Sequence, residues 1–474
     1  MKIKISPPYF PYLAVLCLIV IGSVLRLYNL GFISFWLDEA ATDVFTQQSI
    51  STYWQLVSNL GEVHPPLFYL VEKIILPFGT SEFLYRLFPA IFGIATIPLF
   101  YIIGKKMFGS PVGIIMAILI TFSPFHVIYS QDARMYTMLL FLTGIALIFY
   151  LYAIHSNNIK YWIAFGLVSA LAIWTHFIAF IFIGALIIYS IFHLIKGKKS
   201  PKNLLLSIIV ITIFISPLIL IMKGLFTNRI ASDPTWGLKG IDFIGMSLAL
   251  YFGIFWLPTL ILAILFCFGA AWLFKNEREK FYFLLSIPVI SLGVGLVLSY
   301  RMPMNPRYLI FLLPFLYAVV ASAALPILQR INEKRVIIIF LVLIIGIWAQ
   351  PLYTYYNNTP NINGDWRSAS VFIKNTAKAN DIIIVMPDYN QIPFNYYYNN
   401  STYGTLQINT DSVDDLEKIN STRCKNNISA FIVFNLDIKT VDPSGELMSW
   451  VLSERTTAIQ DFNGVVIEKI TANC

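Results

Sequence analysis

Two adjacent carboxylates occur near the start of the chain. Asp38 and Glu39 follow an aromatic pair in the stretch "FWLDEA", directly after the first long apolar run. A carboxylate can remove a proton as a general base, stabilise the start of a helix or bind a hard metal ion. Which role applies depends on the other reactive side chains that share its side of the fold.

Several other ionisable side chains also lie at the edges of apolar runs. Arginine presents a planar fork that suits phosphate, and histidine can donate a hydrogen bond, bind a metal or cap a helix. Each also has a plain structural interpretation, because arginines at span edges commonly reach lipid headgroups. The candidates are His64, Asp132, Arg134, His176, Arg301 and Arg307, with the neighbouring aromatic residues Tyr136 and Tyr308.

The composition indicates what kind of fold must position these residues. The chain has 474 residues, of which 57% are hydrophobic and only 12% are charged, whereas a soluble domain carries about 25% charged residues. The chain is therefore predicted to be an integral membrane protein. Its net charge of +8 does not indicate nucleic-acid binding, because the basic residues lie mostly in short loops between apolar runs.

Eleven apolar segments are predicted to cross the membrane. A span needs about 17–25 mostly apolar residues. The first segment lacks a clear cleavage site and is interpreted as a retained span, not a signal peptide. The segments are 8–30, 87–104, 111–129, 136–154, 161–175, 177–195, 203–222, one crossing within 244–274, 281–300, 308–328 and 336–352.

The loops between these segments alternate in charge, which predicts the orientation. The positive-inside rule places the basic loops in the cytoplasm. The run 161–195 lies between two of them and is too long for one span, so it is predicted to turn back near Thr175 and His176. The N-terminus is then cytoplasmic, and all the candidate residues lie on the outer face. The basic loops contain Lys105 and Lys106, Lys160, residues 196–202, residues 275–280 and residues 330–335.

The chain divides into a membrane domain, residues 1–352, and an extracytoplasmic domain, residues 353–474. In the first outer loop, residues 31–86, helices are expected to lie along the membrane surface. The fold class is mainly α, a polytopic membrane protein of about eleven transmembrane helices with a small extracytoplasmic α/β domain. The surface helices are expected over 38–58 and 64–78, and the tail has a helical stretch at 366–378 and β-like runs at 381–386, 429–434 and 464–470.

The four cysteines fall into two pairs by position. Cys17 and Cys267 lie within apolar runs and are expected to pack in the core. Cys424 and Cys474 lie in the predicted outer domain, where an oxidising compartment would allow a disulfide. The sequence does not show whether those two meet.

Five stretches follow one another along the chain: "FWLDEA", "HPPLFYLVEKIILPFGTSEFLYRLFPAIFG", "SPFHVIYSQDARMYTMLLFL", "WTHFIAF" and "NPRYLIFLLPFLYAV". In this order they resemble the GT-C superfamily of polyprenyl-phosphate-sugar-dependent glycosyltransferases. The chain is most similar to the branch that includes protein O-mannosyltransferases and the lipid A aminoarabinose transferase. The resemblance covers roughly residues 8–330.

The resemblance implies a role for the acidic pair. Asp38 matches the family's catalytic base, which takes a proton from the acceptor as it attacks the anomeric carbon. Glu39 completes the "DE" pair of the O-mannosyltransferases and would support the base. The implied reaction is an inverting transfer of a hexosyl or pentosyl group from a dolichyl or undecaprenyl monophosphate carrier to a protein, lipid or glycan acceptor.

The resemblance also implies how the donor is bound. Arg307 is the first candidate for the carrier phosphate, followed by Arg134, Arg301 and His64, because preorganised donors stabilise the leaving group's charge. One departure concerns His64, since the aminoarabinose branch has a Glu-Lys pair where this chain reads "VHPP". The residues expected to contact the substrate are Asp132, Tyr136, His176 and Tyr308.

A divalent cation and two other functions are left open. Mg²⁺ or Mn²⁺ could be bound through Asp38, Glu39, Asp132, His64 or His176, although no spacing in the sequence requires a metal. A polysaccharide polymerase or ligase that uses lipid-diphosphate donors is one alternative. A transporter or flippase of lipid-linked sugars is the other, but no internal repeat supports it.

Overall fold

The computed structural model of the chain describes residues 9–60, 64–195, 201–219, 237–253, 255–358, 364–398, 400–435, 442, 444–453 and 456–470. The chain forms two compact units. The helical unit comprises residues 1–30, 48–79 and 85–358, and the C-terminal unit comprises residues 31–47, 80–84 and 359–474. Most of the basic loop 196–202, most of residues 223–243, and Cys474 lie outside the described residues.

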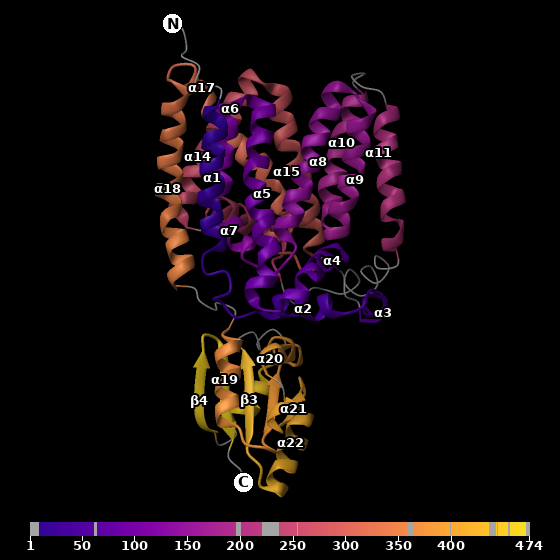
Figure 1. Cartoon of the computed structure of the whole chain (residues 1–474), viewed down its shortest axis with the longest axis vertical. Helices are drawn as coiled ribbons and strands as arrows, with labels where there is room; N and C mark the ends of the chain where they lie inside the picture. The colour runs from indigo at the N-terminus through magenta and orange to yellow at the C-terminus, as the bar shows by residue number, and fades with distance from the viewer. Residues whose placement is uncertain are drawn as a thin grey trace. The chain divides into compact units, whose positions relative to one another are not determined.

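The helical unit is a bundle whose long helices run roughly along one direction (Figure 1). The helices are α1 (Phe10–Leu27), α5 (Glu82–Phe108), α6 (Ser110–Phe122), α7 (Pro124–Ser130), α8 (Tyr136–Ser156), α9 (Ile159–Thr175), α10 (Ala179–Ile195), α11 (Pro201–Ile215), η2 (Ser216–Leu218), α13 (Gly240–Phe252), α14 (Trp256–Asn276), α15 (Arg278–Leu298), η4 (Pro306–Leu312), α16 (Leu313–Ser322), α17 (Leu325–Leu328) and α18 (Glu333–Asn358).

These helices account for the expected membrane spans. Among the described residues, eight helical segments are long and apolar enough to cross a membrane, and a ninth is added if α6 and α7 form one span bent by 59°. The remaining two expected spans are α9 and α10, which are apolar but only 17 residues long. The predicted multi-pass helical fold is therefore confirmed. The region 244–274 contains one long helix, α14, preceded by the short helix α13, as expected.

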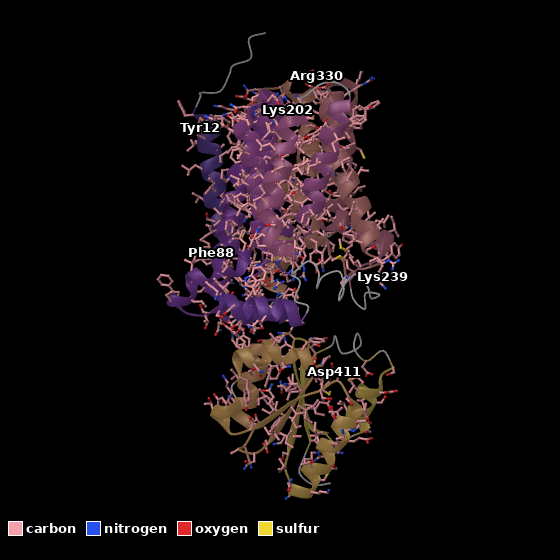
Figure 2. All side chains as sticks on the ribbon, turned by 90° about the vertical axis from the view of Figure 1, so that its right-hand side faces the viewer. Tyr12, Phe88, Lys202, Lys239, Arg330 and Asp411 are labelled. Atoms are coloured by element: carbon pink, nitrogen blue, oxygen red, sulfur yellow. The ribbon has the colours of Figure 1, made fainter. Side chains whose placement is uncertain are left out.

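The expected hairpin at 161–195 is present. Helix α9 ends at Thr175, and His176 is its C-cap residue with an extended backbone. Helix α10 begins three residues later at Ala179. The basic loops gather at one end of the bundle, since Figure 2 shows Lys202 and Arg330 at the end opposite Lys239.

The first loop forms short helices. The expected amphipathic stretch is divided into α2 (Leu37–Gln47) and α3 (Ile50–Leu60). The stretch after Pro65 and Pro66 forms α4 (Leu67–Glu72), followed by the 3-10 helix η1 (Lys73–Phe78). Pro66 is the N-cap residue of α4, so the proline pair precedes the first turn. Helices α3 and α4 lie at one end of the bundle (Figure 1).

The C-terminal unit contains a five-stranded mixed sheet of order β2-β1-β3-β5-β4. Strand β1 pairs in parallel with β2 and β3, while β5 pairs antiparallel with β3 and β4. The strands are β1 (Ile382–Met386), β2 (Leu406–Asn409), β3 (Ala430–Asn435), β4 (Thr456–Phe462) and β5 (Val465–Ile470), and the helices are α19 (Trp366–Thr376), η5 (Asp388–Asn390), α20 (Gln391–Tyr397), α21 (Asn400–Tyr403), α22 (Val413–Asn426) and α24 (Glu446–Ser453).

Side chains alternate along the central strand and build a core on each face of this sheet. Ile382, Ile384 and Met386 pack in the core that includes residues of α22 and α24. Ile383 and Val385 pack in the core that includes residues of α19 and α20. Because neighbouring side chains of a strand point to opposite faces, a continuous apolar run gives a strand buried on both sides.

The prediction that Cys17 and Cys267 pack in the core is wrong. Both cysteines are free and exposed, on α1 and α14. In a chain with apolar residues on all sides of its helices, an apolar neighbourhood does not distinguish the face that packs inside from the face that looks outward. Whether Cys424 pairs with Cys474 was left open by the sequence, and Cys474 lies outside the described ranges.

Candidate functional site

Six of the predicted site residues lie close together in the helical unit, and we call them the His–Arg cluster. The ring centroids of His64 and His176 are 5.3 Å apart, and those of His176 and Tyr308 are 5.4 Å apart. The Arg307 guanidinium carbon lies 5.2 Å from the ring centroid of Tyr136. The cluster consists of His64, Arg134, Tyr136, His176, Arg307 and Tyr308. Its residues come from loops and helix starts that are far apart in the sequence.

The stretch "MNPRY" places Arg307 in the cluster. The Asn305 side chain accepts a hydrogen bond from the Arg307 backbone nitrogen at 3.2 Å, and Pro306 occupies the first turn of η4. An asparagine cap followed by proline is a favourable helix start. The Tyr251 hydroxyl of α13 donates to the Pro306 carbonyl at 2.6 Å. Arg307 is buried, with an exposed fraction of 8%, so protein atoms surround its side chain.

The loop between α7 and α8 supplies Asp132, Arg134 and Tyr136. The loop turns tightly, with the Arg134 backbone nitrogen donating to the Asp132 carbonyl at 2.6 Å. Tyr136 begins α8, and its ring lies 6.3 Å from that of His176 and 6.2 Å from that of Tyr308. Asp132 and Arg134 are both buried. This loop therefore supplies the guanidinium of Arg134 to the cluster and carries the carboxylate of Asp132 two residues earlier.

The protonation state of His176 depends on its burial and on the charges of the cluster. Burial, and then the positive charges of Arg134 and Arg307, lower the pKa of His176 to about 3. The imidazole is therefore neutral at physiological pH. Its Nδ1 accepts a hydrogen bond from the Ile178 backbone nitrogen at 3.1 Å, so the proton belongs on Nε2. That atom is buried and makes no hydrogen bond to any described residue.

This arrangement suits an anionic ligand. The field of two guanidiniums that disfavours a proton on His176 favours a negative charge at the same place. Arginine forks bind phosphate oxygens through paired hydrogen bonds, and the Nε2–H group of His176 supplies a further buried donor. An unsatisfied buried donor costs free energy unless a ligand or water satisfies it. The cluster can thus bind a phosphate group and stabilise negative charge that develops on it.

A buried network behind the cluster was not identified from the sequence. The Tyr317 hydroxyl donates to Ser123 Oγ at 2.9 Å, at the break between α6 and α7. Arg26, which is fully buried, donates to the carbonyls of Ile120 and Thr121 and contacts His126 Nδ1 at 2.7 Å. A cation suits carbonyls at a helix end. An arginine inside an apolar run such as residues 8–30 is the signal that could have identified it.

Asp38 and Glu39 lie in the C-terminal unit, so their geometry is described separately from the cluster. They occupy the first turn of α2, as expected. Glu39 is buried with an exposed fraction of 2%, and Asp38 is partly exposed. The Thr42 hydroxyl donates to the Asp38 carbonyl at 3.2 Å. The carboxylates therefore sit at the positive end of a short helix.

Arg301 and the candidate metal site are not part of the cluster as described. Arg301 is exposed in the turn after α15. Within the described ranges, no group of three or more His, Cys, Asp and Glu side chains is placed to hold a metal ion. The residues that the sequence offers for Mg²⁺ or Mn²⁺, Asp38, Glu39, Asp132, His64 and His176, do not form such a group there.

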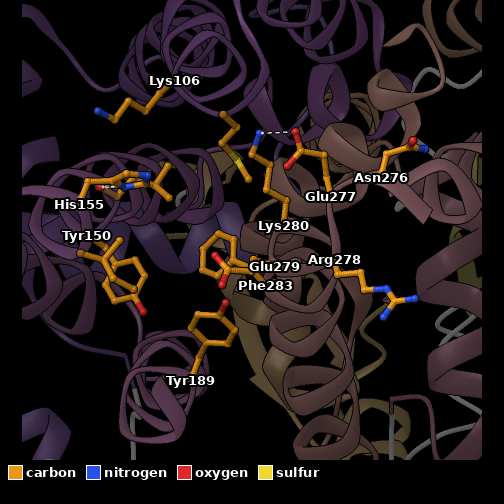
Figure 3. Close-up of a pocket in the computed structure, with 13 residues that line it drawn as sticks. Lys106, Tyr150, His155, Tyr189, Asn276, Glu277, Arg278, Glu279, Lys280 and Phe283 are labelled. Atoms are coloured by element: carbon orange, nitrogen blue, oxygen red, sulfur yellow. Dashed lines mark hydrogen bonds and ion pairs between the residues drawn. The ribbon is translucent and has the colours of Figure 1, made fainter. Parts of the chain in front are cut away.

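A separate cavity of about 590 Å³ opens among the ends of α5, α8, α10 and α15 (Figure 3). Its floor is aromatic, with Tyr150, Tyr189 and Phe283. Its rim carries charges of both signs, and Lys280 lies 3.4 Å from Glu277. This mixture is typical of solvated helix ends, and none of the predicted site residues lines the cavity. The charged rim residues are Lys106, Glu277, Arg278, Glu279 and Lys280.

The fold of nearly the whole chain is similar to that of ArnT and of the archaeal oligosaccharyltransferase AglB. It is similar to ArnT from Cupriavidus metallidurans in the apo state, with a TM-score of 0.62 and 13% identity over 97% of this chain and 98% of that chain. The same enzyme bound to undecaprenyl phosphate gives 0.61 and 13% identity over 96% and 97% of the two chains. AglB from Archaeoglobus fulgidus, in complex with an inhibitory peptide and a dolichol-phosphate, gives 0.54 and 12% identity over 97% and 74%. The fold is thus the GT-C fold.

The family comparison makes the assignment more specific. Residues 63–221 match the family described as dolichyl-phosphate-mannose-protein mannosyltransferase, which confirms the resemblance predicted from the sequence. The family match covers about a third of the 474-residue chain, and the similarity in fold covers nearly all of it. No curated protein sequence matches it. The matched residues include all the cluster members except Arg307 and Tyr308.

Proposed function

We propose that the protein transfers a sugar from a polyprenyl monophosphate carrier to an acceptor on the outer face of the membrane. The observation that carries this proposal is the His–Arg cluster, in which the positive charges of Arg134 and Arg307 act on a neutral, buried His176. Such a site fits a phosphate group better than a neutral sugar, because arginine forks bind phosphate oxygens through paired, charge-assisted hydrogen bonds. The phosphate would belong to the carrier lipid.

The proposed chemistry is a single displacement at the anomeric carbon. Asp38 removes the proton from the acceptor's nucleophilic group as that group attacks the sugar. The bond between the anomeric carbon and the phosphate oxygen breaks, and the electron pair leaves with the carrier phosphate. Arg307, with Arg134, stabilises the charge on this leaving group. Glu39 supports Asp38 or orients the acceptor, and displacement from the opposite face inverts the anomeric centre.

The remaining predicted residues have secondary roles in this proposal. His176 donates from Nε2 to a phosphate or sugar oxygen, and His64 contacts the phosphate beside it. Tyr136 and Tyr308 line the sugar with their rings, and Asp132 accepts hydrogen bonds from sugar hydroxyls. Arg301 meets the carrier at the membrane surface. Related structures support a monophosphate carrier, since ArnT has been seen with undecaprenyl phosphate and AglB with a dolichol-phosphate.

The side of the membrane on which the acceptor is met depends on the orientation of the protein in the membrane. Basic loops gather at one end of the bundle, where Lys202 and Arg330 lie (Figure 2). The positive-inside rule favours a cytoplasmic location for that end. The protein is then a multi-pass protein of the cell membrane with a cytoplasmic N-terminus and an extracytoplasmic C-terminal domain.

A transfer assay with purified protein tests the proposal against its two rivals. The protein is supplied with radiolabelled sugars on polyprenyl monophosphate and on polyprenyl diphosphate, together with protein, lipid and glycan acceptors. We expect label to move from monophosphate donors only. Transfer from diphosphate donors alone would favour a polymerase or ligase. Movement of the intact donor across a vesicle membrane, without transfer, would favour a flippase.

A further inference from the structure

The segment that carries the acidic pair belongs to the same compact unit as the C-terminal tail. This unit joins residues 31–47, residues 80–84 and the tail from residue 359 onwards. Residues 85–358, which form most of the helical unit, separate the first two parts from the tail in the sequence. Contacts within the unit must therefore hold residues 31–47 and 80–84 against the tail. These contacts can be named residue by residue.

Arg367 of α19 is the centre of one set of contacts. Its Nε and Nη2 atoms donate to Glu82 Oε1 at 3.1 and 2.6 Å. Its Nη1 donates to the Phe32 carbonyl at 3.1 Å, and its Nη2 donates to the Gly31 carbonyl at 3.2 Å. One guanidinium thus connects the tail to the chain on the N-terminal side of Asp38 and to the start of α5.

Tyr397 of α20 makes a second set of contacts with the same glutamate. Its hydroxyl donates to Glu82 Oε1 at 2.7 Å and accepts a hydrogen bond from the Phe35 backbone nitrogen at 2.7 Å. Phe35 is fully buried, and its ring lies 4.8 Å from the ring of Tyr396. The Ser34 hydroxyl donates to the Gly364 carbonyl at 3.0 Å. Residues 31–35 are therefore fixed through their backbone as well as their side chains.

These contacts end immediately before the helix that carries the base. Helix α2 begins at Leu37, and Asp38 lies in its first turn. Helix α2 itself packs against α20. Because the backbone at residues 31–35 sets the direction in which α2 starts, the tail determines where the Asp38 carboxylate points.

We infer that the C-terminal domain positions the proposed general base, with Arg367, Tyr397 and Glu82 as positioning residues. The inference rests on the proposed function of Asp38. The role concerns orientation more than stability, since the side chains of Arg367 and Glu82 are 38% and 13% exposed and a partly exposed ion pair contributes about 1 kcal/mol or less. A misplacement of about 1 Å, in contrast, can lower a rate by about 10²-fold.

The test uses full-length purified protein with the variants Arg367→Ala and Tyr397→Phe. Tyr398→Phe and Lys374→Ala are matched controls, because Tyr398 contacts Thr405 and Lys374 lies over the Tyr403 ring, both inside the tail. Hydrogen exchange is measured over residues 37–47 and over β1 and β3. Turnover and the affinity for the polyprenyl phosphate carrier are measured separately.

We expect both variants to exchange faster over residues 37–47 and to lose turnover by up to about 10²-fold, with carrier affinity unchanged. Arg367→Lys should recover part of the turnover, because it keeps the charge but not the fork. The controls should resemble the wild type. Exchange over β1 and β3 shows whether a variant has unfolded the tail. If Arg367→Ala unfolds it, Tyr397→Phe tests the positioning role.

Two results would overturn the inference. One is unchanged exchange over residues 37–47 in both variants, and the other is faster exchange with full turnover. Asp38→Asn separates this outcome from failure of the proposed function. If Asp38→Asn is fully active, the base assignment fails whatever the exchange shows. If it is inactive while Arg367→Ala and Tyr397→Phe behave as wild type, only the positioning role fails.

Discussion

At the residue scale, Arg307 carries the proposed contact with the carrier phosphate. Its guanidinium lies over the rings of Tyr136 and Tyr308, at 5.2 and 5.8 Å from their centroids. A planar cation that contacts two rings keeps a fixed orientation, which a flexible ammonium group would not. Replacing Arg307 with lysine keeps the positive charge and removes the planar fork, so the contributions of charge and geometry can be compared.

We predict that Arg307→Lys weakens carrier binding by about 10- to 100-fold, the loss expected for charge-assisted hydrogen bonds of about 1.5–3 kcal/mol. Carrier affinity can be measured by titrating the purified protein with polyprenyl phosphate. Arg330→Lys is the matched control, since Arg330 is exposed in a basic loop and is not part of the cluster, and it should bind the carrier with nearly wild-type affinity. Equal affinity in both variants would remove Arg307 from the phosphate site.

His176 leads to a prediction about stability and pH. Its pKa is lowered to about 3 by burial and by Arg134 and Arg307, whereas the unfolded value is about 6.5. Between these values the unfolded chain binds a proton that the folded chain does not, so wild-type stability falls as the pH drops below about 6.5. His176→Gln should show a smaller loss of melting temperature over pH 6.5–4.5.

The exposed His155 provides the control for this effect, because His155→Gln should retain the wild-type pH dependence. A pH dependence that is identical in His176→Gln and the wild type would show that His176 titrates normally.

The residues of the cluster could be predicted from the sequence, but their arrangement could not. Span parity assigned His64, Arg134, His176 and Arg307 to one face because orientation depends only on loop charge and span count. The distances between them depend on how the helices pack, and no pattern in the sequence encodes that packing. The neutral state of His176 likewise follows from burial and from two charges that are distant in sequence.

At the element scale, α4 contains a carboxyl group in an unusual environment. Glu72 is fully buried, and neither of its carboxyl oxygens makes a hydrogen bond to a described residue. Burial raises the pKa of Glu72 well above its usual value. The folded state therefore keeps this side chain protonated at pH values where the unfolded chain is ionised.

We predict that Glu72→Gln becomes more stable than the wild type as the pH rises above about 4.5. The unfolded chain loses the Glu72 proton in this range while the folded chain retains it, so wild-type stability declines with pH and the glutamine variant lacks this decline. Melting curves between pH 5 and 8 measure the difference. Glu417→Gln, at an exposed position of α22, should follow the wild type; a constant offset for Glu72→Gln would contradict the prediction.

The sequence predicts best those strands of the sheet that are buried on both faces. Strands β1 and β3 are apolar runs with central places in the sheet. Strands β2 and β4 were not predicted, because they lie at the sheet edges, and edge strands such as "LQIN" and "TTAIQDF" carry polar residues. The bend between α6 and α7 also was not predicted, since an apolar run continues across Ser123 and Pro124.

At the scale of the whole molecule, the proposed orientation makes a labelling prediction. Ser51 and Ser444 are exposed and lie on the proposed outer side, while Lys105 is exposed on the proposed cytoplasmic side. In a background without Cys17, Cys267, Cys424 and Cys474, an impermeant thiol reagent applied to intact cells should label Ser51→Cys and Ser444→Cys. Labelling of Lys105→Cys alone would reverse the orientation and place the His–Arg cluster on the cytoplasmic side.

The organisation into two units could be predicted only in part. A change in composition near residue 353 indicated a separate tail, and the described helix α18 ends at Asn358. The membership of residues 31–47 and 80–84 in the tail's unit could not be predicted, because it depends on contacts such as Arg367 with Glu82. Local sequence does not specify a partner so far along the chain.

We propose that this chain is a sugar transferase whose general base is Asp38. Sugar transfer by purified wild-type protein and by Asp38→Asn, with the same polyprenyl monophosphate donor and acceptor, tests it most directly. We expect Asp38→Asn to lower turnover by about 10²–10⁴-fold, the usual contribution of a general base, with carrier affinity unchanged and a smaller loss in Glu39→Gln. Full activity in Asp38→Asn together with loss of activity in Asp132→Asn would contradict the account and place the base in the loop between α7 and α8.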